Sequence, residues 1–226
     1  MNPIYVNLWF KNKFMSTILI VIIVANVLFS YKGFNDMFFF RKYDFHIASI
    51  RNGEQVRMFS SAFLHADMSH LFFNMLTLYF FAPVVVSHLG EINFALIYVA
   101  SLLFGNLLTL YLHKNDLSYR AIGASGAVTG VLYSAILLQP KMMLGIFFII
   151  PMPAYLFGII YLLYSIYGMK AKNDNIGHTA HFGGAIGGYV FTIVKQPEML
   201  TDNLFMVVVL AIPIVILFVM ARMGKL

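Results

Sequence analysis

Long apolar runs separated by short polar connections repeat along most of this chain. A helix that crosses ~30 Å of hydrocarbon needs roughly 20 apolar residues at 1.5 Å per residue. By this measure we count seven candidate spans, near residues 14–30, 70–88, 92–112, 125–139, 143–168, 177–194 and 204–221. Helices are the expected form, because a helix satisfies its own backbone hydrogen bonds in lipid. The pattern therefore predicts an all-α polytopic membrane protein.

The fourth candidate span is shorter than the others. Its helical pattern begins at about Ser125 and ends before Pro140, which gives only ~22 Å of helix. Its first turn should therefore lie below the membrane surface, and the preceding loop should be packed in protein or line a wet cavity. The long connection before the second span carries Phe38-Phe39-Phe40 beside Arg41-Lys42, a mixture expected at the membrane interface.

Composition narrows the class further. Of the 226 residues, 61% are hydrophobic and 11% are charged, which is typical of a membrane protein without a sizeable soluble part. Cysteine is absent, so disulfides, thiol catalysis and cysteine-based metal sites are excluded. The net charge of +6 is spread between the spans and favours contact with anionic lipid over binding of nucleic acid. We predict one integral domain over residues 1–226, with a core at about 14–195 and an additional span at 204–221.

A serine between glycines opens the fourth span, in Gly123-Ala124-Ser125-Gly126. The glycines let the backbone bend and let other chains approach closely. The helix N-terminus adds unpaired N–H groups and a positive dipole end, both suited to an oxyanion. By itself such a motif is more often a small-residue packing site, so Ser125 becomes a candidate nucleophile only beside a base.

His181, in the sixth span, is the candidate base. It lies three residues before Gly184, and Gly184 and Gly188 share one helix face. Gly126 and Gly130 form a similar face in the fourth span. Packing of the two faces would bring the imidazole to the serine hydroxyl. The alternative is a histidine that is only hydrogen-bonded beside two packed glycine faces.

His70 and Asn74 lie one turn apart on the second span and project from the same face. Both side chains can donate to one anion, which makes them candidate oxyanion donors. The alternative is that they hydrogen-bond between helices as structural contacts. Two further histidines, His65 and His178, are expected to brace loops.

Taken together, these residues resemble the rhomboid family of intramembrane serine proteases. The resemblance covers most of the chain. It runs through Arg57, Ser61-Ala62-Phe63-Leu64-His65, His70, Asn74, the serine motif, and Ala180-His181-Phe182-Gly183-Gly184 with Gly188. It implies a rhomboid-like six-helix core, to which the last span adds a C-terminal seventh transmembrane helix.

The resemblance also implies a mechanism. Ser125 and His181 would form a dyad without an acidic third member, and no Asp or Glu lies in the fourth or sixth span. His181 would remove the serine proton, and Ser125 would form an acyl-enzyme that water hydrolyses. The Ser125 N–H, His70 and Asn74 would hold the oxyanion. Substrates would be transmembrane helices that unwind at the site, and no cofactor or metal is expected.

Several details bear on this resemblance. Pro151 and Pro153 should weaken the fifth helix, which in the family borders the path by which the substrate arrives sideways. Many relatives carry an aromatic residue four positions after the serine, stacked on the histidine, whereas this chain has Thr129, which leaves the orientation of His181 less constrained. A Trp-Arg pair of the family appears here as Val56-Arg57, which leaves the packing of the first connection open.

The resemblance implies a multi-pass protein of a bacterial cell (inner) membrane with a cytoplasmic N-terminus. On that orientation four basic residues lie inside, namely Lys11, Lys13, Lys141 and Lys195. The remaining basic residues lie outside, which is opposite to the positive-inside rule. The orientation therefore stays open, as does the oligomeric state.

Three alternatives remain. An inactive rhomboid-like protein would bind transmembrane clients, although such proteins usually lack the serine or the histidine. A proton relay could use His65, His70, His178 and His181, but no acidic residue accompanies them in the membrane. A metal-dependent protease could use His178 and His181 as ligands, but the chain has no His-Glu-x-x-His. The favoured partners are transmembrane substrates and the lipid bilayer, with no nucleic acid.

Overall fold

Six long helices surround one short helix in the computed structural model, which describes residues 15–146, 150–171 and 176–225. The short helix is α8 (Ser125–Leu138). The long helices are α2 (Thr17–Asn35), α6 (Met68–Leu89), α7 (Glu91–Leu112), α9 (Ala154–Ala171), α10 (His178–Lys195) and α12 (Leu204–Arg222), the last preceded by α11 (Met199–Asp202). Among the described residues, five of the long helices are long and apolar enough to cross a membrane, namely α2, α6, α7, α9 and α12. The chain is therefore an all-α polytopic membrane protein, as predicted.

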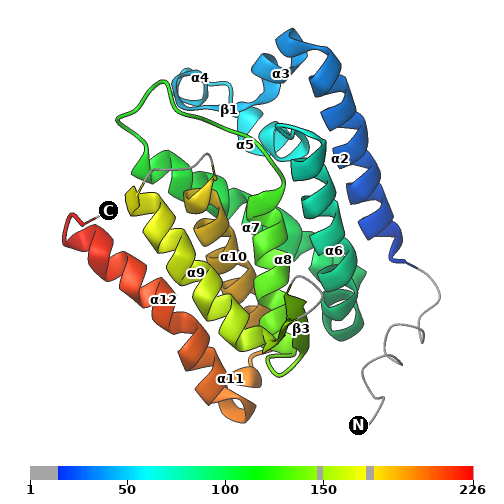
Figure 1. Cartoon of the computed structure of the whole chain (residues 1–226), viewed down its shortest axis with the longest axis vertical. Helices are drawn as coiled ribbons and strands as arrows, with labels where there is room; N and C mark the ends of the chain where they lie inside the picture. The colour runs from blue at the N-terminus through cyan, green and yellow to red at the C-terminus, as the bar shows by residue number, and fades with distance from the viewer. Residues whose placement is uncertain (1–14, 147–149, 172–175, 226) are drawn as a thin grey trace.

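Helix α8 lies at the centre of the bundle (Figure 1). All of its residues from Gly126 to Leu137 are buried, as expected for a helix that is apolar on every face. Val128 and Val131 pack with residues of α6 and α7, whereas Leu132 and Ile136 pack with residues of α9, α10 and α12. The predicted boundaries are confirmed, and its 14 residues span only ~21 Å.

The predicted fifth span is wrong in its first part. Residues Met143–Ile146 (β3) and Ile150–Pro153 (β4) pair as antiparallel strands, with Leu144 opposite Met152. Helix α9 begins only at Ala154. Pro151 and Pro153 therefore precede the helix and do not weaken it. Proline lacks an N–H and clashes with a preceding helical turn, which disfavours a helix through two closely spaced prolines, although α6 and α12 each accommodate a single one, Pro83 and Pro213.

The first connection is folded, and its elements gather at one end of the bundle (Figure 1). They are α3 (Met37–Tyr43), β1 (Phe45–His46), α4 (Ile47–Arg51), α5 (Arg57–Ser60) and the 3-10 helix η1 (Ser61–Phe63). On α3, Phe38 is 81% exposed, and Arg41 and Lys42 are also exposed. Exposed aromatic and basic side chains on one short helix fit the expected interfacial position.

A buried ion cluster anchors this connection. The Asp44 carboxylate is 1% exposed and accepts hydrogen bonds from Arg57 at 2.9 Å and from Arg120 at 2.7 Å. Arg57 is also buried and donates to Glu54 at 2.6 Å. The absence of tryptophan before Arg57 therefore does not loosen the packing. Since Arg120 lies in β2 (Arg120–Ala121), which pairs with β1, the cluster also fixes the strand that leads to α8.

Candidate functional site

The loop before α8 has a conformation that only glycine adopts readily. Gly123 has a φ of 114°, in the left-handed region that L side chains disfavour. Its N–H donates to the Ser61 carbonyl at 3.0 Å, which ties the loop to η1. Ser125 is the first residue of α8 and is half-buried. Within the described part of the chain no side chain caps this helix end, so first-turn N–H groups remain available to an anion.

The imidazole of His70 lies against this loop. A Cβ on Gly123 would lie 2.9 Å from His70 Nε2 and 3.6 Å from Ser125 Oγ. The other ring nitrogen, Nδ1, accepts the N–H of Ala66 at 3.4 Å. In the neutral ring the proton is therefore on Nε2. The structure thus places the protonated nitrogen of His70 against the loop that leads to Ser125.

Asn74 is buried one turn after His70 on α6. Its Nδ2 donates to the His70 carbonyl oxygen at 3.1 Å. A side-chain amide carries two hydrogens on nitrogen, so the Asn74 amide has a second N–H that can donate to another acceptor. The two predicted donors do share a face, and one hydrogen of Asn74 is used within the helix.

His65 links the loop to the first span. Its Nδ1 lies 2.7 Å from Ser30 Oγ, which itself donates to the Phe63 carbonyl. Because the serine proton is used there, Nδ1 of His65 must be the donor and Nε2 the acceptor. Nε2 lies 3.5 Å from the Ala124 N–H. Burial, followed by the charge of His70, lowers the pKa of His65 from 6.5 to about 3, so the ring stays neutral and braces the loop as predicted.

We expect the free energy of unfolding to fall as the pH falls, because of His65. Its folded-state pKa of about 3 is below the ordinary value of 6.5, so between these values the unfolded chain binds a proton that the folded chain does not. The loss begins near the unfolded pKa and reaches up to about 1.4 kcal/mol per pH unit below it. Thermal unfolding in detergent from pH 8 to pH 4 measures it. His65→Gln cannot titrate and should give a flatter curve; equal slopes would contradict the expectation.

His181, on α10, is held by a residue that the sequence did not single out. Its Nδ1 lies 3.0 Å from the hydroxyl of Tyr161 on α9. The two rings are nearly parallel, at 22°, with centroids 6.1 Å apart. The same hydroxyl lies 3.1 Å from Thr129 Oγ1 on α8. The fifth span contains several tyrosines, and no pattern in the sequence indicates which of them faces α10.

The glycine faces of α8 and α10 meet as predicted. A Cβ on Gly184 would overlap the Gly126 carbonyl, and one on Gly188 would overlap the Gly130 carbonyl. A Cβ on Gly126 would lie 3.1 Å from the Ala180 carbonyl oxygen. Gly126 follows Ser125, and Ala180 precedes His181. This contact therefore brings the segment that carries Ser125 against the segment that carries His181.

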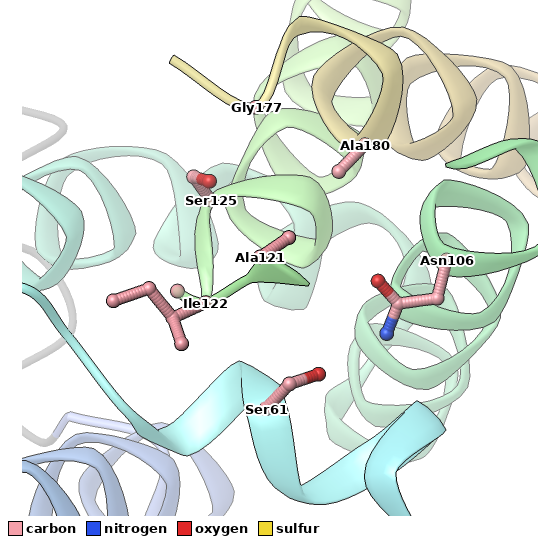
Figure 2. A pocket seen from close by; sticks show the side chains of 8 residues that line it. Ser61, Asn106, Ala121, Ile122, Ser125, Gly177 and Ala180 are labelled. Carbon is pink, nitrogen blue, oxygen red and sulfur yellow. The ribbon is translucent and has the colours of Figure 1, made fainter. Parts of the chain in front are cut away.

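A cavity opens beside the first turn of α8 (Figure 2). The residues that line it come from η1, α7, the segment from β2 to the first residue of α8, and the start of α10, namely Ser61, Asn106, Ala121, Ile122, Gly123, Ser125, Gly177 and Ala180. Asn106 donates from Nδ2 to the Met58 carbonyl at 2.7 Å, which orients its amide at the wall. Ser61 and Asn106 were not predicted as site residues. Ser125 and the loop before α8 therefore line a cavity.

Comparisons with known proteins point to one family. The family model for the Rhomboid domain matches residues 52–198. RHOMBOID-like protein 12, mitochondrial, from Arabidopsis thaliana is 30% identical over 181 residues, which cover 74% of this chain and 54% of that protein. Putative rhomboid protease YdcA from Bacillus subtilis is 33% identical over 153 residues, 66% of this chain and 72% of that protein. The chain thus spans about half the length of the Arabidopsis relative.

Proposed function

This chain belongs to the rhomboid family, and from that premise we propose that it is a serine endopeptidase acting inside the membrane. Ser125 is the nucleophile and His181 the general base. The observation that carries the proposal is the convergence on the first turn of α8. The ring of His70, which lies on α6, contacts the loop before α8 at Gly123. Ala180 brings the start of α10 against Gly126.

In the proposed reaction, His181 Nε2 takes the proton of Ser125 Oγ as the oxygen attacks the scissile carbonyl. The tetrahedral oxyanion accepts hydrogen bonds from the Ser125 N–H and from the His70 and Asn74 side chains. The intermediate collapses when the C–N bond breaks, and His181 protonates the leaving amine. A water molecule, deprotonated by His181, then hydrolyses the acyl ester and restores the serine.

The proposed substrates are transmembrane helices of other membrane proteins. A helix hides its carbonyl groups in internal hydrogen bonds, so the substrate must unwind near Ser125 before attack. The bilayer supplies the substrate by lateral diffusion. We further propose that residues 1–226 work as one integral unit in a bacterial cell membrane. One relative comes from a bacterium and another is named mitochondrial, so membrane fractionation of the source cells tests this location.

A fluorophosphonate probe tests the proposed function directly. Such a probe reacts covalently with an activated serine. The purified protein in detergent should be labelled, whereas Ser125→Ala and His181→Ala should not be. Absence of labelling in a folded wild-type preparation would favour the second candidate, an inactive rhomboid-like protein that binds transmembrane clients. Equal labelling of all three proteins would mean that another serine reacts.

We expect His70→Ala to slow substrate cleavage by about 10²- to 10³-fold, because one oxyanion donor typically contributes about 3 kcal/mol of transition-state stabilisation. Asn74→Ala should act in the same direction. The matched control is Asn93→Ala, since Asn93 on α7 also donates from Nδ2 to a carbonyl four residues earlier, that of Leu89 at the end of α6, at 2.8 Å. Turnover of a reconstituted transmembrane substrate measures the effect. Wild-type rates in both His70→Ala and Asn74→Ala would refute the assignment.

A further inference from the structure

We propose that Tyr161 is the positioning residue that fixes the orientation and the tautomer of His181, and that Thr129 in turn orients the Tyr161 hydroxyl. This inference rests on the proposed function, because it concerns the same base. The three residues come from three helices. Thr129 lies on α8, Tyr161 on α9 and His181 on α10.

The contacts form a continuous chain. The Tyr161 hydroxyl lies 3.0 Å from His181 Nδ1 and 3.1 Å from Thr129 Oγ1. Thr129 is buried, so its hydroxyl is shielded from competing water. The near-parallel stack of the two rings, at 22°, restricts rotation of the imidazole. A hydrogen bond and a ring contact together fix one orientation of His181.

The hydrogen bonds between Thr129, Tyr161 and His181 allow two arrangements of the protons, and only one of them leaves His181 able to act as a general base. If Tyr161 donates to Nδ1, the imidazole proton is on Nε2, and that nitrogen cannot accept the serine proton. If Tyr161 donates to Thr129 Oγ1 instead, the phenol oxygen accepts a hydrogen bond from Nδ1–H of His181. Nε2 then carries no proton and can accept one. Thr129 therefore has a specific role, because an acceptor at this position draws the phenol proton away from His181.

A second contact fixes Tyr161 relative to α8. One turn before it on α9, the Gly158 carbonyl accepts a hydrogen bond from Tyr133 of α8 at 2.7 Å. This bond sets the register of the two helices beside the site. No Asp or Glu occurs in the sequences of α8, α9 or α10. A neutral phenol thus takes the position beside Nδ1 that a carboxylate would occupy only at a large desolvation cost in a membrane.

The arrangement also explains the small residue four positions after Ser125. An aromatic ring at position 129 would occupy the space that the phenol of Tyr161 fills from α9. The threonine leaves that space open and adds a hydroxyl that the phenol can bond. The ring against His181 is therefore supplied by a different helix, and Thr129 does not leave the histidine unsupported.

The test measures fluorophosphonate labelling over a range of probe concentrations, which separates the maximal rate of labelling from the apparent affinity for the probe. Tyr161→Phe should lower the maximal rate about tenfold, the equivalent of one neutral hydrogen bond, with an affinity within about twofold. Thr129→Val should act in the same direction, and Thr129→Ser, which keeps the hydroxyl, should restore the rate. The matched control is Tyr167→Phe on the same helix, since Tyr167 is 59% exposed.

The tautomer of His181 gives an independent readout. Nitrogen NMR of histidine-labelled protein, with His181→Ala for assignment, should show the neutral ring protonated at Nδ1 in the wild type. A wild-type protein that is labelled although its ring is protonated at Nε2, or unchanged maximal labelling rates in Tyr161→Phe and Thr129→Val, would overturn the role of Tyr161 and leave the proposed function intact. Wild-type protein that is folded but unlabelled would overturn both.

Discussion

His181→Ala is expected to lower the rate of substrate cleavage by about 10⁴- to 10⁶-fold, an effect comparable to loss of the serine nucleophile. Without the imidazole, nothing accepts the serine proton during attack or returns it to the leaving amine. Losses of this size follow removal of the histidine in serine hydrolases generally. The measurement is turnover of a transmembrane substrate reconstituted with the enzyme in lipid vesicles.

The control for this variant is His88→Ala. His88 is an exposed histidine in the last turn of α6, so its loss should leave turnover unchanged. Unfolding temperatures of both variants establish that the proteins are folded. Residual activity of His181→Ala within tenfold of the wild type would show that another group acts as the base.

Gly184→Val is expected to destabilise the fold by at least about 3 kcal/mol. A Cβ at this position would overlap the Gly126 carbonyl, and backbone atoms cannot move aside as the end of a flexible side chain can. Overpacked cores usually lose 1–3 kcal/mol, and contacts with backbone exceed that range. The helices must separate, so labelling of Ser125 should be lost together with stability.

Gly177→Ala is the matched control for the glycine face. A Cβ on Gly177 would come no closer than 3.9 Å to Ala180 Cβ, and its φ of −75° is open to alanine. Unfolding in detergent by a chemical denaturant gives the free energy of unfolding of both variants. If Gly184→Val unfolds at the same denaturant concentration as Gly177→Ala, the close backbone contact between α8 and α10 is not required.

The positions of most helices were predictable because their apolar runs are about 20 residues long, the length of a membrane-spanning helix and too long for a strand. The short fourth span was predictable as well, since Ser125 and Pro140 mark its limits. The residues before α9 were not. Residues 143–153 are as apolar as a helix interior, and a short apolar run does not by its period distinguish a strand from a helix. Pro151 and Pro153 were the available signal, and they were assigned to the helix.

The candidate site was partly predictable for a similar reason. Ser125, His181 and the glycine faces lie within single helices, where spacing sets which residues share a face. Tyr161 could not be found this way, because its role depends on how α9 is rotated and shifted relative to α10. The same holds for Asn106, whose amide reaches the cavity from α7. Contacts between helices depend on packing, which the spacing along one helix does not encode.

The ion cluster around Asp44 has a consequence for the order of folding. Its partners Arg57 and Arg120 are separated in the chain by both α6 and α7. The cluster can therefore close only after these two helices have been inserted as a hairpin that returns the chain to the same side of the membrane. Contacts between residues far apart in sequence form late, because the loop between them must first be ordered. The strand that leads to Ser125 is thus secured only once that hairpin is in place, so a newly made chain orders the loop that carries Ser125 after its first membrane helices have assembled.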